Sequence, residues 1–229
     1  MYRVIKEMNA EEKMVEKVYG VLTDYDLSSW TADLATDYTR TSQQRTGTPP
    51  YMAHELLKGT SGTHLYRHDV ESFFYIMLMM CARHTIGSSG EGKEQRVIMR
   101  EGRGLPYQDW FNQHNYEALG RFKKALFSDM EHIELSQAFE DFRGWLLKLQ
   151  WRFSEGFELK TAFARQQQEQ EWDGIPVVGA APFNDETLGG CIDYSTVIKP
   201  VHHLKGKLEG LIIRYNPTSS PLPTPTGTV

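Results

Sequence analysis

Residues 45–75 read RTGTPPYMAHELLKGTSGTHLYRHDVESFFY, and the fold class follows from how this stretch changes character along its length. Its first half closes a polar segment with Gly47-Thr48-Pro49-Pro50, since glycine and proline interrupt regular structure. Its second half starts a new element at Asp69, and every residue from Phe73 to Ala82 is apolar. A helix that is apolar all round is buried on every side. The sequence therefore predicts a buried helix over residues 69–82.

Two amphipathic helices are predicted further along the chain, because apolar residues recur there at three- and four-residue steps. The first helix presents one apolar face made of Leu119, Phe122, Leu126, Phe127 and Met130. The second presents a face made of Leu135, Ala138, Phe139, Phe142, Leu146, Leu149 and Phe153. We expect the second helix to continue past Phe157 into the polar, solvated run 165–171, and we expect Gly87–Gly92 to be a flexible loop.

The N-terminal part has a different pattern. Two short β-type runs, Tyr2–Ile5 and Val18–Leu22, flank a charged stretch from Lys6 to Lys17 that is predicted to be a long hairpin loop. The polar residues 28–50 have no periodicity and are predicted to form an extended loop. The expected fold class is therefore mainly α with a short N-terminal β-hairpin.

Composition narrows the class of protein. With 229 residues, 40% of them hydrophobic, the chain can bury a core. A net charge of −5 argues against a nucleic-acid partner, and no apolar run reaches the roughly 18 residues that a membrane span needs. Charged residues within the first seven positions argue against a secretory signal. Cys81 and Cys191 lack the spacing of a disulfide framework, so we expect an intracellular location, cytoplasmic or nuclear.

Three local patterns that bear on function stand in a fixed order. Asp24-Tyr25 ends a predicted strand, where phosphoryl transfer requires a carboxylate that holds magnesium against the β- and γ-phosphates. Taken alone, an Asp-aromatic-Asp group is more often a turn. The segment Gly47–Glu55 then closes the polar loop and opens a helix, and Asp69-Val70-Glu71-Ser72 begins the buried helix.

This order resembles the activation segment and following helix of eukaryotic protein kinases, and it resembles the fungal-type protein kinase family more closely. The resemblance extends over roughly residues 1 to 200 and implies a partial protein kinase domain, the C-terminal lobe of the α+β kinase fold. Residues 201–229 are expected to form a C-terminal segment that ends in a disordered tail rich in Pro, Ser and Thr. The phrases that carry the resemblance are Gly20–Leu27, Arg45–Thr48, Tyr51–Leu57, Arg67–Tyr75 and Phe183–Gly190.

The resemblance also implies roles for individual residues. Asp24 would bind magnesium and so the ATP phosphates, while Gly47 and Thr48 would position the acceptor peptide. Glu55 would close the segment in a pair with an arginine that the sequence does not identify. Asp69 would hydrogen-bond the backbone of the catalytic loop. Two departures are Asp26 and His54, which stand where kinases generally have glycine and proline.

Several kinase parts have no counterpart in these residues: the glycine-rich phosphate loop, the β3 lysine and the Asp and Asn of H-R-D-x-x-x-x-N. The general base is expected upstream of Met1, so no catalytic residue is assigned. A full-length parent would use ATP and Mg²⁺ to phosphorylate Ser or Thr of a protein substrate. This chain alone is expected to be inactive and to bind neither ligand tightly.

The alternative is a non-catalytic, pseudokinase-like module that binds a partner such as another kinase domain. In the family, a helix before the catalytic loop partly covers the apolar helix, so we expect an exposed apolar patch that drives association.

Two further patterns mimic ligand sites. Gly87–Lys93 has the spacing of a phosphate-binding loop, but Glu94 replaces the required Ser or Thr, so a plain connector is expected. His64 and His68 stand four apart like zinc ligands on a helix, and we expect a surface pair without metal because no third ligand is placed.

Overall fold

The computed structural model describes residues 2–8, 14–20, 47–59, 64–89, 94–102, 104–128, 133–174 and 181–202. The chain divides into two compact units, residues 1–44 and 45–229. Asp24, Asp26 and the polar segment up to residue 46 lie outside the described residues.

In the first unit, β1 (Tyr2–Met8) and β2 (Met14–Gly20) form the predicted antiparallel hairpin, with Tyr2 paired to Gly20 and Met8 to Met14. Both strands run into the charged stretch that was predicted to be loop, and that part of the prediction was wrong. The register places Lys6 opposite Glu16.

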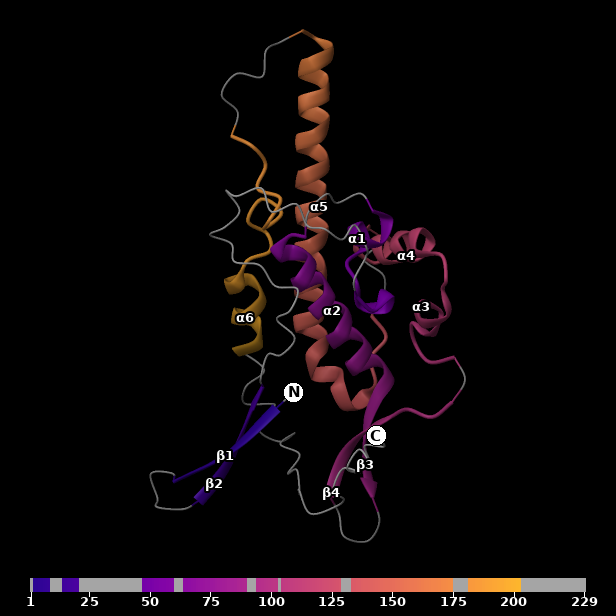
Figure 1. Cartoon of the computed structure of the whole chain (residues 1–229), viewed down its shortest axis with the longest axis vertical. Coiled ribbons are helices and arrows are strands. Elements are labelled where there is room, and N and C mark those ends of the chain that lie inside the picture. Colours follow the sequence, from indigo (N-terminus) through magenta and orange to yellow (C-terminus); the bar gives the residue numbers. More distant parts are fainter. Residues whose placement is uncertain are drawn as a thin grey trace, which may run out of the picture. The chain divides into compact units, whose positions relative to one another are not determined.

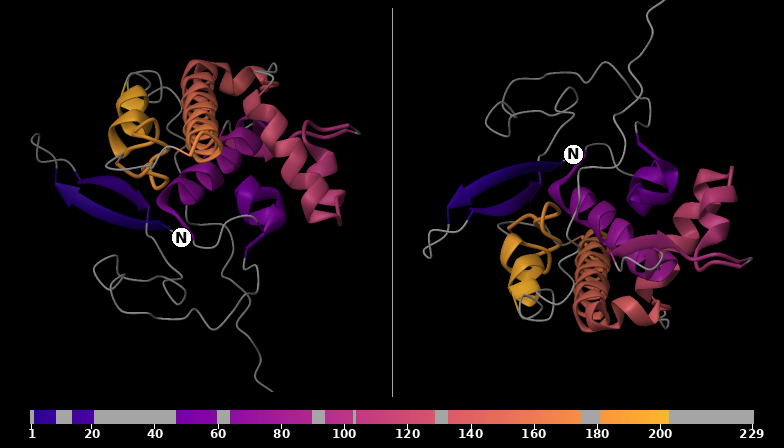
Figure 2. Two further views of the ribbon diagram at one scale, coloured as in Figure 1. Left: turned by 90° about the horizontal axis from the view of Figure 1, so that it is seen from above. Right: turned by 90° about the horizontal axis from the view of Figure 1, so that it is seen from below.

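The described part of the second unit is mainly helical, so the mainly α fold class is confirmed (Figure 1). Its central element is α2 (Tyr66–Arg83), which contains the predicted buried helix, and α5 (Arg143–Trp172) packs beside it (Figure 2). The remaining elements are the 3-10 turn η2 (Pro49–Tyr51), α1 (His54–Lys58), β3 (His84–Ser89), β4 (Glu94–Met99), α3 (Gln108–Asn112), α4 (Tyr116–Ser128), the 3-10 turn η4 (Gln137–Phe142) and α6 (Tyr194–His202).

An aromatic cluster joins the three long helices. The ring centroids of Phe74 on α2 and Phe127 on α4 lie 5.7 Å apart, and Phe127 lies 5.0 Å from Phe153 on α5. All three side chains are buried. Large rings contribute much of the apolar area that a core removes from water, so this cluster fixes how α2, α4 and α5 pack.

The prediction that α2 is buried on every side was wrong. Phe73, Ile76 and Met80 follow one another at three- and four-residue steps, and they are 42, 46 and 40% exposed. Meanwhile Arg67 and Glu71 on the same helix are fully buried. Apolar composition alone does not report how far each face of a helix is covered. On this face the ring of Phe73 meets that of Trp145 edge-on, with centroids 5.9 Å apart, and the three side chains still remain exposed.

The helices after α2 follow the predicted periodicity with two corrections. Leu119, Leu126 and Phe127 are buried on α4 as expected, but Phe122 is exposed. The predicted second helix starts as η4 and becomes α-helical only at Arg143. Its polar end does continue to Trp172, and Figure 1 shows it extending beyond the other helices.

The first three residues of the predicted loop Gly87–Gly92 lie in strand β3, so for them the prediction was wrong, and residues 90–92 lie outside the described residues. β3 and β4 pair antiparallel, with Ile86 opposite Val97 and Gly87 opposite Arg96. A Cβ atom at Gly87 would lie only 2.5 Å from Cδ1 of Ile98, so the lack of a side chain at Gly87 leaves room for the Ile98 side chain. A phosphate-binding loop leads from a strand into a helix, whereas this segment leads into a strand, so the resemblance in spacing was coincidental.

Candidate functional site

The candidate site is the segment Gly47–Met52, which precedes helix α1. Gly47 has a φ of 139°, and a Cβ atom there would lie 3.0 Å from Cγ of Met52. The carbonyl of Thr48 accepts a hydrogen bond from the backbone N–H of Tyr51 at 2.8 Å, which closes a 3-10 turn. The side chain of Thr48 is exposed and makes no capping bond to this turn. The segment therefore presents the Thr48 hydroxyl from a closed backbone turn.

Lys123 on α4 stabilises this turn through hydrogen bonds to its backbone. Its Nζ donates hydrogen bonds to the carbonyls of Met52 at 2.6 Å and Pro49 at 3.1 Å. The same ammonium lies 4.0 Å from the ring centroid of Tyr75 and 5.1 Å from that of Trp110. Burial lowers the pKa of Lys123 to about 7, although the negative charge of Glu71 acts to raise it. A fully buried lysine with two carbonyl acceptors is a structural anchor for the turn.

Glu71 on α2 holds the start of α1. Its Oε1 accepts hydrogen bonds from the backbone N–H of His54 at 2.7 Å, from His54 Nδ1 at 3.0 Å and from the Tyr75 hydroxyl at 2.7 Å. Burial raises the pKa of Glu71, but the charge and donors of His54 and the Tyr75 hydroxyl outweigh it, so the pKa is lowered. A proline at position 54, usual in kinases generally, has no N–H to donate. His54 therefore gives this protein a contact that the usual residue could not make.

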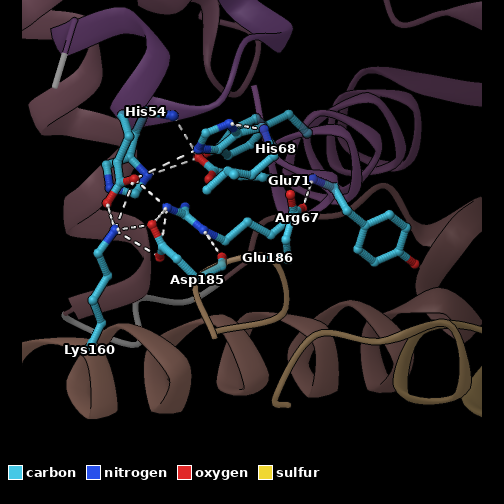
Figure 3. A network of polar contacts seen from close by, with 11 residues as sticks. His54, Arg67, His68, Glu71, Lys160, Asp185 and Glu186 are labelled. Carbon is cyan, nitrogen blue, oxygen red and sulfur yellow. Dashed lines mark hydrogen bonds and ion pairs between the residues drawn. The ribbon is translucent and has the colours of Figure 1, made fainter. Parts of the chain in front are cut away.

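The arginine that pairs with Glu55 is Arg67, in the first turn of α2. Figure 3 shows Arg67 beside Asp185, with Lys160 reaching the same group. Arg67 Nη2 lies 2.5 Å from Glu55 Oε2 and 3.1 Å from the carboxylate of Asp185. Lys160 of α5 bridges the same two carboxylates, with Nζ 3.2 Å from Glu55 and 2.9 Å from Asp185. Arg67 is fully buried, whereas Lys160 and Asp185 are about one-third exposed, so α1, α2 and α5 meet at a partly buried network of two cations and two anions.

This network lowers the pKa of the Glu55 carboxyl well below its ordinary value of 4.5. Burial acts in the opposite direction, and the donors and charges of His68, Arg67 and Lys160 overcome it. His68 Nε2 lies 3.7 Å from Glu55, which is too long for a hydrogen bond, so we attribute the lowering chiefly to Arg67 and Lys160. Glu55 is therefore ionised wherever the protein is folded near neutral pH.

The segment Phe183–Gly190 caps the N-terminus of helix α2. Glu186 accepts the backbone N–H of Tyr66 through Oε2 at 2.6 Å and that of Arg67 through its carbonyl at 3.2 Å. The carbonyl of Asp185 accepts Arg67 Nε at 2.7 Å. The first N–H groups of a helix lack partners within it, and a carboxylate at that end also suits the helix dipole.

Gly156 on α5 lets this capping segment pack closely. A Cβ atom at Gly156 would lie 2.6 Å from Cβ of Leu188, which is buried in a left-handed conformation with φ of 50°.

The residues predicted for the site do not all lie together in the structure. Gly47 and Thr48 lie in the turn, and Glu55 lies in the partly buried network. Asp69, in the first turn of α2, has a 70% exposed side chain whose carboxylate lies 3.5 Å from His64 Nε2. Asp24 lies outside the described residues, and its role stays a prediction. His68, expected on the surface, is fully buried, and its Nδ1 accepts the N–H of Leu65.

Metal ligation is not visible in the part of the chain that the structure describes, where no group of three or more His, Cys, Asp or Glu side chains could hold an ion. Cys81 and Cys191 are both buried and free. Across the described helices, none is both long and apolar enough to cross a membrane.

The model of the fungal protein kinase family matches residues 4–81. Residues 4–81 are therefore similar to the fungal protein kinase family. The match is narrower than the resemblance drawn from sequence, and it ends within α2, before Lys123, Lys160 and Asp185. No curated protein and no solved structure matches the chain.

Sequence reasoning missed Lys123, Lys160 and Asp185. Lys123 had a usable signal, since it lies four residues after Leu119 and three before Leu126, on the face that is buried. Asp185 lies in the segment Phe183–Gly190, which carried the resemblance but gave Asp185 no role. Lys160 had no signal, because its partners come from distant parts of the chain.

Proposed function

We propose that this chain is the part of a fungal Ser/Thr protein kinase that holds the acceptor peptide. The parent protein would transfer the γ-phosphate of ATP to a Ser or Thr hydroxyl of a protein. The supporting observation is that buried charged side chains from α2 and α4 fix the backbone of Gly47–His54. Phosphoryl transfer depends mainly on positioning and electrostatics, so a rigid peptide platform is a functional requirement.

Within this proposal, Gly47 and Thr48 contact the acceptor peptide, and the Glu55–Arg67 pair supports them from beneath. Asp69 is proposed to hydrogen-bond the catalytic-loop backbone, a role that would suit its exposed position at the start of α2. Asp24 is proposed to hold magnesium and, through it, ATP. The printed residues contain no H-R-D-x-x-x-x-N run, so no general base is assigned among them.

The cellular setting is part of the same proposal. Cys81 and Cys191 are free and buried, which suits a reducing compartment, and we propose a cytoplasmic or nuclear location.

Hydrogen exchange tests the peptide-binding proposal on the chain itself. A pool of Ser- and Thr-containing peptides is added, and mass spectrometry follows exchange along the chain. We expect slower exchange in fragments that cover residues 47–58, and a smaller effect in the Lys123→Met variant, which loses both bonds to the turn. An unchanged exchange rate in these fragments at saturating peptide would reject the proposal.

Nucleotide binding gives a separate test. The 229-residue chain is expected to bind magnesium–ATP weakly, because it lacks the phosphate loop and its lysine. Titration calorimetry that finds micromolar affinity would contradict this part.

A second candidate function is a non-catalytic binding module, favoured by the exposed apolar face of α2. Phe73, Ile76 and Met80 form a contiguous stripe of the kind that marks protein interaction surfaces. Here the occupant would be a helix of a partner kinase domain. The same exchange experiment with a candidate kinase domain separates the two functions, since protection would then appear over residues 73–80.

A further inference from the structure

A pocket of about 250 Å³ opens beside the candidate site, where helix α2 ends. Tyr51 of the 3-10 turn forms one wall and Phe111 of α3 another, and their rings meet edge-on with centroids 6.0 Å apart. Met79 of α2 and Met99 of β4 add apolar surface. The charged member of the lining is Arg83, at the last turn of α2.

Arg83 is buried, and among the described residues it has no charged partner. It is 8% exposed, and its Nη2 donates to the side-chain oxygen of Gln108 at 2.7 Å. Its guanidinium carbon lies 4.3 Å from the ring centroid of Phe111, so the ring covers one face of the cation. Its Nε is buried with no hydrogen-bond partner.

Among the described lysines and arginines that are buried, Arg83 differs from the others. Arg67 pairs with two carboxylates, and Lys123 donates to two carbonyls close to Glu71. A buried guanidinium that bonds one neutral amide is unfavourable, because burial removes its hydration without supplying an anion. A carboxylate or phosphate in the pocket would complete it, since guanidinium groups bind such anions with strong, charge-assisted hydrogen bonds.

The position of the pocket indicates what carries the anion. Tyr51 belongs both to the pocket and to the turn that is proposed to hold the acceptor peptide, so a bound peptide passes within reach. The volume is below the range typical of small-molecule sites, about 300 Å³ and above, and fits a single side chain. Met79 and Met99 would contact its methylene groups.

We propose that the Arg83 pocket binds an acidic side chain of the polypeptide held on Gly47–Met52, and so selects substrates with a carboxylate or phosphate near the acceptor residue. This inference rests on the proposed function and adds a substrate class to it.

The test compares labelled peptides that share one Ser-containing sequence and differ at one position, which carries Glu, phosphoserine or neutral Gln. The varied position is moved along the peptide in turn, and fluorescence anisotropy measures affinity for the 229-residue chain. We expect one position where an acidic residue binds at least about tenfold tighter than Gln, the effect of one good charged contact. A preference for phosphoserine over Glu would assign the pocket to phosphorylated substrates, and equal binding would assign it to acidic ones.

Two variants tie the preference to the pocket. Arg83→Gln is expected to abolish it, while Arg121→Gln, the same change on an exposed arginine of α4, is expected to preserve it. Gln108→Glu places a carboxylate against Arg83, so it should raise the melting temperature and remove the preference. Gln166→Glu, at an exposed position of α5, is its control and should do neither.

The outcomes separate this inference from the function on which it rests. If all peptides bind but Glu and phosphoserine gain nothing over Gln, the pocket proposal fails and peptide binding stands. A preference that survives Gln108→Glu, or one lost equally in Arg121→Gln, also overturns it. If even the neutral peptides leave anisotropy and exchange unchanged, the proposed function itself fails.

Discussion

Replacing Arg67 by Gln tests whether the partly buried network supports the candidate site. Arg67 is fully buried, pairs with Glu55 and Asp185 and also bonds the carbonyl of Asp185. Its removal leaves two carboxylates that share one cation, Lys160. Breaking a buried ion pair in this way costs about 3–5 kcal/mol. Domains of this size have about 5–15 kcal/mol of stability in total, so the variant should be severely weakened.

Arg121 supplies a matched control on the surface. It pairs with Glu117 at 2.6 Å, almost the same separation as the 2.5 Å of the Arg67–Glu55 pair, but its side chain is 68% exposed. An exposed pair four residues apart on a helix contributes about 0.3–0.5 kcal/mol. The two Arg→Gln variants therefore differ mainly in burial, and the predicted gap between them is several kcal/mol.

Urea unfolding, followed by circular dichroism and tryptophan fluorescence, measures both variants. The midpoint should fall strongly for Arg67→Gln with an unchanged slope, and barely move for Arg121→Gln. The gap between wild type and Arg67→Gln should also narrow below about pH 4.5. Because the pKa of Glu55 is lower in the folded protein than in the unfolded chain, Glu55 stabilises the fold at pH values above its unfolded pKa of 4.5. This contribution is lost as the pH falls below that value. A loss under about 1 kcal/mol for Arg67→Gln, or equal losses in the two variants, would refute the reasoning.

Three more predictions concern single contacts. The pKa of Lys123 is about 7 in the folded protein and about 10.5 in the unfolded chain, so between these pH values the unfolded chain binds a proton that the folded chain does not. Stability should therefore rise with pH over this range. The Lys123→Met variant should show a smaller rise when thermal unfolding is compared at pH 7 and pH 9. His54→Pro removes two donors from a buried carboxylate and should cost about 1–3 kcal/mol in urea unfolding. Gly156→Ala forces a methyl group against Leu188 and should cost about 1–3 kcal/mol, while Gly144→Ala on the same helix, with open space around it, should be neutral or stabilising.

Each of these has a result that would count against it. A Lys123→Met variant with the same pH slope as wild type would mean that another group carries the slope. A fully stable His54→Pro variant would show that the two donors contribute little. Equal effects at Gly156 and Gly144 would show that the close approach to Leu188 relaxes freely.

The helices could be predicted from the sequence because their periodicity is local. Apolar residues at helical spacing identified α2, α4 and α5 within a few positions. The β3–β4 hairpin could not be found in this way, since Gly87 and its serine neighbours favour a loop locally. Cross-strand pairs such as Ile86 with Val97 stabilise the hairpin, and the local residue pattern of a single strand does not reveal them.

The site was predictable only in part, for a related reason. Glu55 was expected to need an arginine, but no local rule connects it to Arg67 twelve residues later. Glu71 did carry a signal, since it lies three and four residues before Phe74 and Tyr75 on the buried face of α2. A charge on a buried face requires partners, and the sequence indicated that need without identifying His54.

The anchors beneath the turn are charged because of what they must hold. Pro49 and Pro50 have no N–H, so the turn that they form cannot join a helix or a sheet ladder through their nitrogens. The carbonyls of Pro49 and Met52 nevertheless point into the interior, where an unpaired carbonyl is costly. No apolar residue can bond a carbonyl, and Lys123 reaches both with one ammonium. The shape of the turn is thus determined by α4, more than 70 residues away, and the local Gly-Thr-Pro-Pro motif specifies only that such an anchor is needed.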